Sequence, residues 1–133
     1  MTPDEIKALL QRLHNEVANG GKWEVIPELF DEKYASRYGV YREQAHYGHE
    51  VVREMYQSLH TEFAEFRSSI NAMIIEGELA ASNWTCTGIY QGEPTETVKP
   101  GQKVTWSGTS WWRVRDGKIL ERWSYGDDLT PVE

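Results

Sequence analysis

The sequence predicts an α+β domain in which helices come first and a run of antiparallel strands follows. Apolar residues recur at helical spacing up to about residue 60, and after Phe66 the pattern changes to strands. The turn signal Asp116-Gly117 then joins two long strands into a hairpin. The length of 133 residues fits one domain that spans residues 1–133.

Helices are expected in three places in the first half of the chain. The first begins at Pro3, because Thr2 and Glu5 have the spacing of a capping box, and it ends at Asn19-Gly20-Gly21. Its apolar stripe consists of Ile6, Leu9, Leu10, Leu13 and Val17. A short second helix is expected to hold Trp23, Ile26, Leu29 and Phe30. The stretch from Tyr34 to Tyr47 has no clear period and is interpreted as a loop that can include a short strand, and a third helix starts near Gly48.

The second half of the chain predicts four strands. Ile70 to Ile75 leads through the hairpin signal Glu76-Gly77-Glu78 into a strand from Leu79 to Tyr90. A polar segment with two prolines, Gln91 to Gln102, is expected to be a loop. The last two strands run from Lys103 to Arg115 and from Lys118 to Asp127.

Charge and composition exclude several classes of partner. The formal net charge is -7 and the basic residues are scattered, so neither nucleic acid nor an anionic membrane is an expected partner. No segment is long and apolar enough for a signal peptide or a membrane span. The single cysteine, Cys86, cannot form an intramolecular disulfide and suits a reducing compartment, so a cytoplasmic location is expected. Cys86 itself is interpreted as a buried structural thiol.

A two-residue turn at Asp116-Gly117 predicts which side chains of the final hairpin share a face. Arg115 then opposes Lys118, and continued pairing brings Trp106 opposite Asp127. The face expected to lie under the helices carries Trp106, Gly108, Ser110, Trp112, Val114, Ile119, Trp123, Tyr125 and Asp127. The opposite face carries Thr109, Trp111, Arg113, Leu120, Arg122 and Ser124.

The first of these faces predicts a ligand pocket. Large rings beside Gly108 and Ser110 would leave a hollow with Asp127 at its end, which suits a flat apolar ligand with a reactive polar group. A carboxylate among tryptophans loses hydration, which raises its pKa and favours proton transfer near neutral pH. The other interpretation from spacing alone is that Asp127 ends a strand in solvent and the aromatic residues simply form the core.

Several short motifs together resemble the SnoaL-like polyketide cyclase family of the nuclear-transport-factor-2-like superfamily. The C-terminal one is Gly117-Lys118-Ile119-Leu120-Glu121-Arg122-Trp123, followed by Asp127 four residues after the tryptophan. The others are Asn19-Gly20-Gly21, Leu29-Phe30-Asp31, Gly48-His49-Glu50-Val51-Val52, Ile75-Glu76-Gly77-Glu78-Leu79-Ala80, Asn83-Trp84-Thr85-Cys86-Thr87-Gly88 and Pro100-Gly101-Gln102-Lys103-Val104. Their order and spacing cover nearly the whole chain.

The resemblance implies a curved antiparallel β-sheet wrapped around the N-terminal helices, a cone-shaped barrel with an internal pocket. It also implies a homodimer through the outer sheet face, which would suit Trp111 and Leu120. The characterised cyclases of the family close a ring by an aldol reaction without metal or organic cofactor, with an aspartate at the position of Asp127 as general acid/base. Many members carry a histidine where this chain has Arg37 and Tyr38, so the polar chemistry of the pocket is altered here.

The leading hypothesis is therefore a cofactor-independent enzyme of the cyclase or isomerase type, with Asp127 as the catalytic acid/base and a small, flat, hydrophobic carbonyl compound as substrate. The expected substrate-binding residues are Arg37, Tyr38, Trp84, Trp106, Ser110, Trp112, Trp123 and Tyr125. The alternative is a non-catalytic dimeric protein that uses the same pocket to bind a small ligand. No metal is expected, since His46 and His49 have no further ligand set around them, and His14 is interpreted as a surface or hydrogen-bonded residue.

Overall fold

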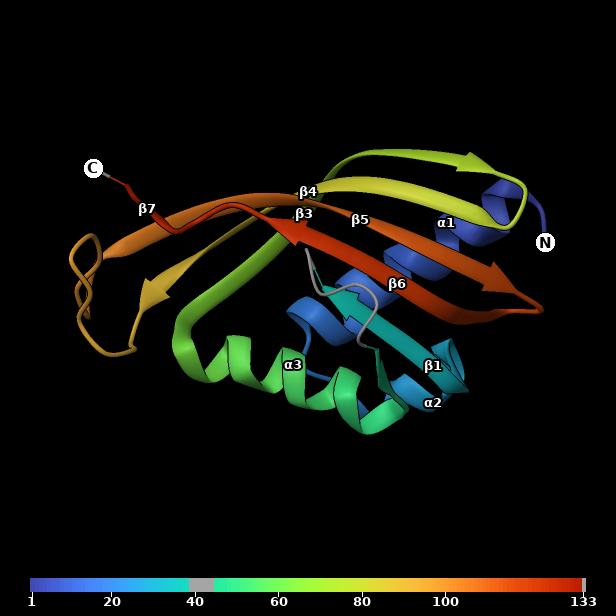
Figure 1. Ribbon diagram of the computed structural model, residues 1–133, viewed down its shortest axis with the longest axis horizontal. Coiled ribbons are helices and arrows are strands. Elements are labelled where there is room, and N and C mark those ends of the chain that lie inside the picture. The colour runs from blue at the N-terminus through green and yellow to red at the C-terminus, as the bar shows by residue number, and fades with distance from the viewer. Residues whose placement is uncertain (39–44, 133) are drawn as a thin grey trace.

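The computed structural model describes residues 1–38 and 45–132, and it has the predicted α+β architecture (Figure 1). Its helical segments are α1 (Pro3–Arg12), η1 (Leu13–Asn19), η2 (Trp23–Val25), α2 (Ile26–Leu29) and α3 (His49–Glu62). Its strands are β1 (Phe30–Tyr38), β2 (His46–Tyr47), β3 (Phe63–Glu76), β4 (Leu79–Tyr90), β5 (Lys103–Arg115), β6 (Lys118–Gly126) and β7 (Thr130–Pro131). None of the helices in these described ranges is long and apolar enough to cross a membrane.

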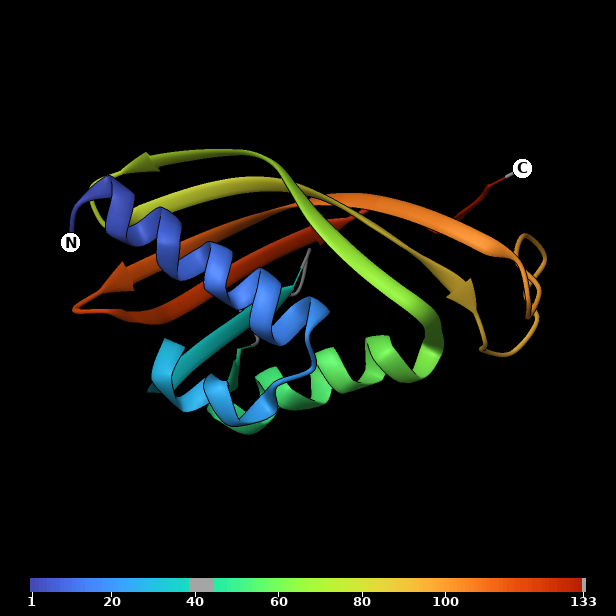
Figure 2. The same cartoon turned by 180° about the vertical axis from the view of Figure 1, so that it is seen from behind.

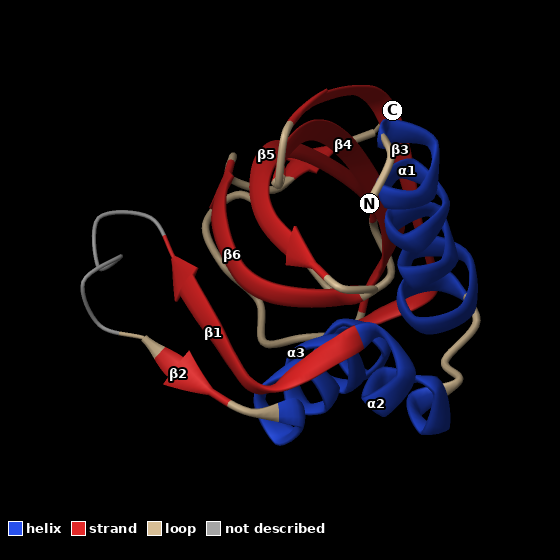
Figure 3. Ribbon diagram, turned by 90° about the vertical axis from the view of Figure 1, so that its right-hand side faces the viewer, coloured by secondary structure: helices blue, strands red, loops and turns tan. Residues whose placement is uncertain are grey.

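The strands form one strongly curved sheet. Its order is β2-β1-β6-β5-β4-β3, and β7 pairs with β5. The pairs are antiparallel, as expected, except for β1 and β6, which run parallel. The end-on view shows the sheet curling around its concave side while its two edge strands, β2 and β3, stay apart (Figure 3). The cone is therefore open rather than a closed barrel.

The helices cover the concave face of the sheet. Thr2 caps α1 through the expected capping box with Glu5, and Figure 2 shows α1 lying across the inner side of the long strands. Ile6 and Leu10 are buried in the main core, which also contains η1, α2 and α3 residues and the sheet residues Val114 and Ile119. The amphipathic pattern of the first helix thus places it where the sequence predicts.

Two expectations for the first half of the chain are wrong in detail. The second helix is split into η2 and α2, and Phe30 begins β1 instead of ending that helix. The stretch expected to be a loop, Tyr34 to Tyr47, begins inside the nine-residue strand β1 (Phe30–Tyr38) and ends in the short strand β2 (His46–Tyr47). Phe30 and Tyr34 are buried and their ring centroids lie 4.7 Å apart, so packing and pairing with β6 decide the strand where local periodicity does not. Residues 39–44 of the expected loop lie outside the described residues.

A second, smaller core lies toward the far end of the sheet. It consists of Phe63, Phe66, Cys86, Tyr90, Val98 and Val104. Val98 comes from the predicted loop of residues 91–102, where its side chain is only 1% exposed. The space between this cluster and the main core is where the interior pocket forms.

Candidate functional site

The final hairpin starts in the predicted register and then departs from it. Asp116 and Gly117 have positive φ angles of 50° and 78°, as a type I′ turn requires. Val114 opposes Ile119, but the next pair is Arg113 with Glu121. Leu120 is therefore an extra residue in β6, a β-bulge.

This bulge reverses the faces of β6 from Glu121 onward. Because side chains alternate along a strand, a slip of one residue moves every later side chain to the other side of the sheet. Arg122 and Ser124 lie on the concave face, while Trp123 and Tyr125 lie on the outer face. The expectation that Trp123 and Tyr125 line the interior pocket is wrong for this reason.

The charge on Glu121 gives a physical reason for the bulge. On the outer face the Glu121 carboxylate accepts hydrogen bonds from Arg113 Nε at 3.1 Å and Arg37 Nε at 3.3 Å. In the expected register Glu121 would oppose Trp112, whose side chain is 2% exposed in the main core. Burying a carboxylate there would cost several kcal/mol, so the bulge avoids a large desolvation penalty.

The concave face holds an interior pocket of about 180 Å³. Its walls come from η1, α3 and the inner faces of β3, β4, β5 and β6. Most of its described lining is apolar or aromatic, with a few polar groups among the rings. The described lining residues are His14, Ala18, Met55, Tyr56, Leu59, Phe66, Ser68, Trp84, Cys86, Trp106, Arg122 and Ser124.

Arg122 brings a positive charge into this apolar pocket. Its residue is only 8% exposed, and its Nε and Nη2 atoms donate to Ser110 Oγ at 3.3 and 3.1 Å. The guanidinium also lies over the Trp112 ring, 4.8 Å from its centroid, and Nη1 is 3.3 Å from the Met55 sulfur. These contacts hold the guanidinium in place, and it stays charged at any pH at which the protein folds.

Trp84 fills the hollow that was expected over Gly108. A Cβ on Gly108 would clash with the Trp84 ring and with the Tyr125 carbonyl oxygen. The Trp84 Nε1 donates to Ser110 Oγ at 2.9 Å, and Ser110 in turn lies 3.3 Å from Ser124 Oγ. The small residues of β5 therefore make room for a ring from β4 instead of for a ligand.

His14 reaches the pocket because the helix widens there. In the π-helical segment η1, residues five apart lie on the same face, which places His14 and Asn19 over the same residue, Ser68 of β3. His14 Nε2 lies 2.8 Å from Ser68 Oγ, while the Asn19 amide bonds the Ser68 main-chain oxygen and nitrogen at 2.9 and 2.7 Å. Burial, with a smaller contribution from the charge of Arg122, lowers the pKa of His14 to about 4. The imidazole is thus neutral at pH 7.

Cys86 lies next to this group and is buried, as the sequence predicts. Burial raises the pKa of its thiol, and the hydrogen bond with Ser68 and the charge of Arg122 offset only part of that rise. The thiol is therefore protonated at neutral pH, which makes it a weak nucleophile.

Asp127 does not face the pocket in the described structure. It follows the last residue of β6, its side chain is exposed, and its main-chain N–H donates to the Ser107 carbonyl oxygen at 2.8 Å. The expected opposition to Trp106 is lost because of the bulge at Leu120. The interpretation of Asp127 as a solvent-exposed residue at a strand end fits this position, whereas its expected place among tryptophans is wrong.

The other predicted site residues are spread over three environments. Trp84 and Trp106 line the pocket, and Ser110 lies directly beneath it as the partner of Arg122. Trp112 is in the main core, with its Nε1 donating to Ser82 Oγ at 3.3 Å. Arg37 is on the outer face in its ion pair with Glu121.

Tyr38 is the last residue of β1 and pairs with Ser124, so its backbone ends beside the pocket. Its side chain lies outside the described part of the structure.

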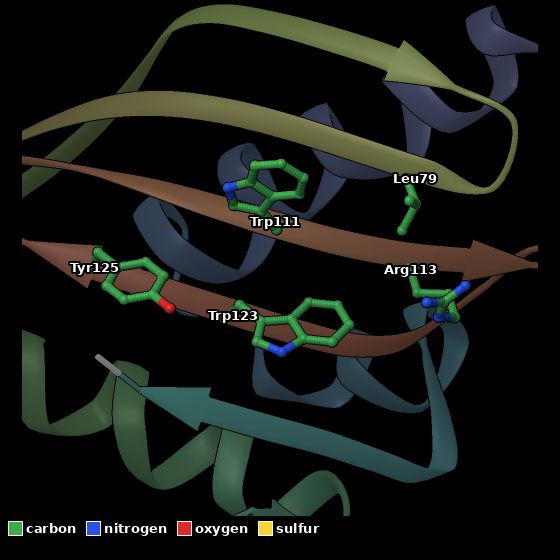
Figure 4. Close-up of a pocket in the computed structure, with 5 residues that line it drawn as sticks. All are labelled: Leu79, Trp111, Arg113, Trp123 and Tyr125. Carbon is green, nitrogen blue, oxygen red and sulfur yellow. The ribbon is translucent and has the colours of Figure 1, made fainter. Parts of the chain in front are cut away.

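A second hollow, of about 460 Å³, lies on the outer face of the sheet (Figure 4). It is lined by Leu79, Trp111, Arg113, Trp123 and Tyr125. Trp111 is 49% exposed and Tyr125 40% exposed, so this face is an apolar surface. Trp111 lies on the outer face, as the sequence predicts, but its neighbours there are Trp123 and Tyr125 rather than Arg122.

No three His, Cys, Asp or Glu side chains within residues 1–38 and 45–132 are arranged to hold a metal ion. His49, which the sequence suggested as a possible ligand, has its Nε2 atom 2.8 Å from the Phe30 carbonyl oxygen. That contact ties the start of α3 to β1.

Sequence reasoning missed the polar groups of the pocket, namely His14, Ser68, Arg122 and Ser124. Glu121 could have indicated the inward position of Arg122, because the expected register would place the Glu121 carboxylate opposite the core residue Trp112. His14 adjoins the apolar stripe of the first helix, and that position was the one available indication of its place.

Comparisons with known proteins agree with this architecture. The family model described as "SnoaL-like polyketide cyclase" matches residues 8–133. A protein assigned as a SnoaL-like polyketide cyclase from Jannaschia sp. CCS1 has a TM-score of 0.79 and 23% identity, with 96% of this chain and 90% of that one covered. AclR from Streptomyces galilaeus, assigned as a hydroxylase, has a TM-score of 0.79 and 20% identity, with 95% and 81% covered.

Wild-type IdmH from Streptomyces antibioticus, assigned as a polyketide cyclase, has a TM-score of 0.77 and 21% identity, with 91% of each chain covered. Curated proteins give no significant sequence match. The structural likenesses support the open-cone fold, and the family model covers almost the entire sequence. The chain therefore belongs to the SnoaL-like polyketide cyclase family.

Proposed function

We propose that the protein is a cofactor-independent enzyme of the cyclase or isomerase type that binds a small, flat carbonyl compound in the interior pocket. Family membership supports the reaction class. The observation that carries the proposal is the fixed guanidinium of Arg122 in a pocket whose walls are otherwise mostly apolar and aromatic. Such a pocket binds a ring by its faces and orients it by one strong polar contact.

Arg122 would bind the carbonyl oxygen of the substrate. Its Nη1 atom now contacts the sulfur of Met55, and a thioether is a weak hydrogen-bond acceptor. A carbonyl oxygen that replaces the sulfur forms a stronger, charge-assisted bond. When a proton leaves the neighbouring carbon, negative charge develops on that oxygen, so the guanidinium stabilises the enolate more than the ketone.

Among the residues that the structure describes, we consider two candidates for proton transfer. The family resemblance assigns it to Asp127, which is exposed outside the described pocket. The pocket itself offers His14, which is neutral at pH 7 and has one ring nitrogen able to accept a proton, although its lowered pKa makes it a weaker base than a free histidine. We propose that His14 takes the proton from the carbon next to the carbonyl and returns it to the product, so that protons balance over one cycle.

Deuterium exchange into the methyl group of acetophenone, followed by NMR in D₂O, tests this proposal. The parent protein should exchange these protons faster than buffer does. Arg122→Met should slow the exchange by about 10²–10³-fold, the typical cost of losing one donor to a developing oxyanion. His14→Gln should slow it by about 10²–10⁴-fold. Asp127→Asn is the matched control and should exchange like the parent; loss of activity in that variant alone would assign the base to Asp127 instead.

The alternative function is a non-catalytic small-ligand-binding protein. It is favoured by one observation, that none of the described residues lining the pocket is an aspartate or glutamate. This alternative predicts that acetophenone binds with no exchange above buffer in any variant. Saturable binding without exchange would therefore replace the enzyme proposal by the binding one.

We also propose that the protein forms a homodimer through the outer face of the sheet. The support is the cluster of exposed Trp111 and Tyr125 with half-buried Trp123, since large exposed apolar patches usually mark an interface (Figure 4). Cross-strand pairing continues this row outward from Trp111 through Ala81 to Ile74, which is 74% exposed. A second copy would cover side chains that are costly to leave in water.

A further inference from the structure

The interior pocket is too small to enclose a large ligand. Its volume is about 180 Å³, whereas sites for drug-sized molecules usually measure about 300–1,000 Å³. An apolar cavity of about 150 Å³ holds a single benzene ring. A ligand with one ring therefore fills the described pocket, and anything attached to that ring must leave it.

A polar groove of about 500 Å³ lies on the other side of one pocket wall. It runs between the first helical segments, α1 and η1, and the edge strand β3. His14 and Ser68 line both the groove and the interior pocket. The groove is lined by Lys7, Gln11, His14, Asn15, Asn19, Arg67, Ser68, Ser69, Ile70, Asn71, Ala72 and Met73.

The side chains of the groove suit an anionic group. Lys7, Gln11 and Asn15 are spaced four residues apart and form one row along the helical segments. Arg67 lies across from this row on β3. Neither Lys7 nor Arg67 takes part in a salt bridge with any residue that the structure describes. The chain is acidic overall, so two cations and four amide side chains along one groove form a local exception.

The wall between the two compartments consists of side chains that can rotate. His14 is joined to Ser68 by one neutral hydrogen bond between side chains, 2.8 Å long. Asn19 separately holds the Ser68 backbone through two hydrogen bonds. Rotation of His14 and of the Ser68 hydroxyl would thus open a passage while the backbone of β3 stays in place.

We propose that the pocket and the groove form one two-compartment site for an amphipathic ligand, with an apolar ring inside and a carboxylate tail in the groove. The tail passes between His14 and Ser68 and reaches Lys7 and Arg67. The inner half of this site rests on the proposed function, and the groove is an addition to it. The ligand class is accordingly a ring compound that carries an acidic chain.

A series of ω-phenylalkanoates with two to eight methylene groups tests the proposal by titration calorimetry, with the corresponding primary amides as neutral partners. Carboxylate affinity should rise at least tenfold over that of the matched amide once the chain is long enough to reach the groove. This gain should shrink in high salt, because the cations are exposed. The double variant Lys7→Gln/Arg67→Gln should lose the gain. Lys103→Gln, which removes an exposed charge on β5, should keep it.

The outcomes separate this inference from the proposed function. If acetophenone binds and the carboxylates show no gain at any length, the groove is not part of the site and the inference is overturned. A gain that persists in the double variant also overturns it, because the anion is then held elsewhere. If acetophenone itself fails to bind, the proposed function fails, and a gain for long carboxylates would then show a groove that acts alone.

Discussion

The protonation of His14 links the geometry of the pocket to the stability of the fold. Its pKa falls from 6.5 in the unfolded chain to about 4 in the folded one, because the imidazole is buried near Arg122. Between pH 6.5 and pH 4 the unfolded state binds a proton that the folded state does not bind. The free energy of unfolding should therefore fall as the pH falls through this window, with the full contribution present above pH 6.5. At 1.36 kcal/mol per unit, the lowered pKa corresponds to about 3 kcal/mol.

Urea denaturation of the parent and of His14→Gln at pH 7.5 and pH 4.5 measures this contribution. Glutamine can still form a hydrogen bond with Ser68 but does not titrate. Between pH 7.5 and pH 4.5 the free energy of unfolding should therefore fall by about 2–3 kcal/mol less in the variant than in the parent. His46→Gln, which removes an exposed imidazole, controls for the general effect of replacing a histidine.

If the difference in stability between parent and His14→Gln is the same at both pH values, His14 is not a buried neutral imidazole. An NMR titration of its ring protons gives the same answer directly, because a midpoint near 6.5 would contradict the burial that the structure shows.

Three other predictions concern packing, assembly and reactivity. Gly108→Ala should destabilise the protein by about 1–3 kcal/mol in urea, since the added methyl group clashes with the Tyr125 carbonyl oxygen and with the Trp84 ring; an unchanged midpoint would contradict this close packing. Trp111→Glu should convert a dimer into a monomer by light scattering, and a parent protein that is monomeric at micromolar concentration would contradict the proposed interface. Cys86 should react with a thiol reagent at pH 8 far more slowly than a free thiol, because it is buried and its pKa is raised; rapid reaction would show an open pocket.

Local signals predicted most of the fold. The capping box of Thr2 and Glu5 begins α1, and the turn at Asp116-Gly117 joins β5 to β6 as expected. The capping box and the turn each depend on residues that are close in sequence, so the residue types alone predict them. Strand β1 is different, because its pairing with β6 involves residues more than eighty positions away. Its aromatic residues gave no period that distinguishes a strand from a loop.

The candidate site was harder to predict, because one extra residue in β6, Leu120, determines which side chains of that strand face the pocket. A two-residue turn determines the first pairs of a hairpin, but the bulge at Leu120 then exchanges the two faces of β6. The exchange moves Arg122 into the pocket and carries Trp123 out of it. The two registers differ in where they place the charge of Glu121, which lies either opposite the core residue Trp112 or beside Arg113. The balance depends on Glu121, whose partner Arg37 comes from another strand.

The spacing of residues in the first helix also did not predict that His14 lines the pocket. An ideal α-helix has 3.6 residues per turn, and the π-helical widening of η1 shifts the residues that face β3. The contacts of His14 and Asn19 with Ser68 depend on this widening, and they join the helix to a strand some fifty residues away.

A crystal structure of the protein with acetophenone would show which of the two hollows binds the ligand. We expect the phenyl ring in the interior pocket against Trp106, with the carbonyl oxygen within hydrogen-bonding distance of Arg122. Acetophenone bound only in the outer hollow between Trp111 and Trp123, with the interior pocket empty, would contradict this expectation.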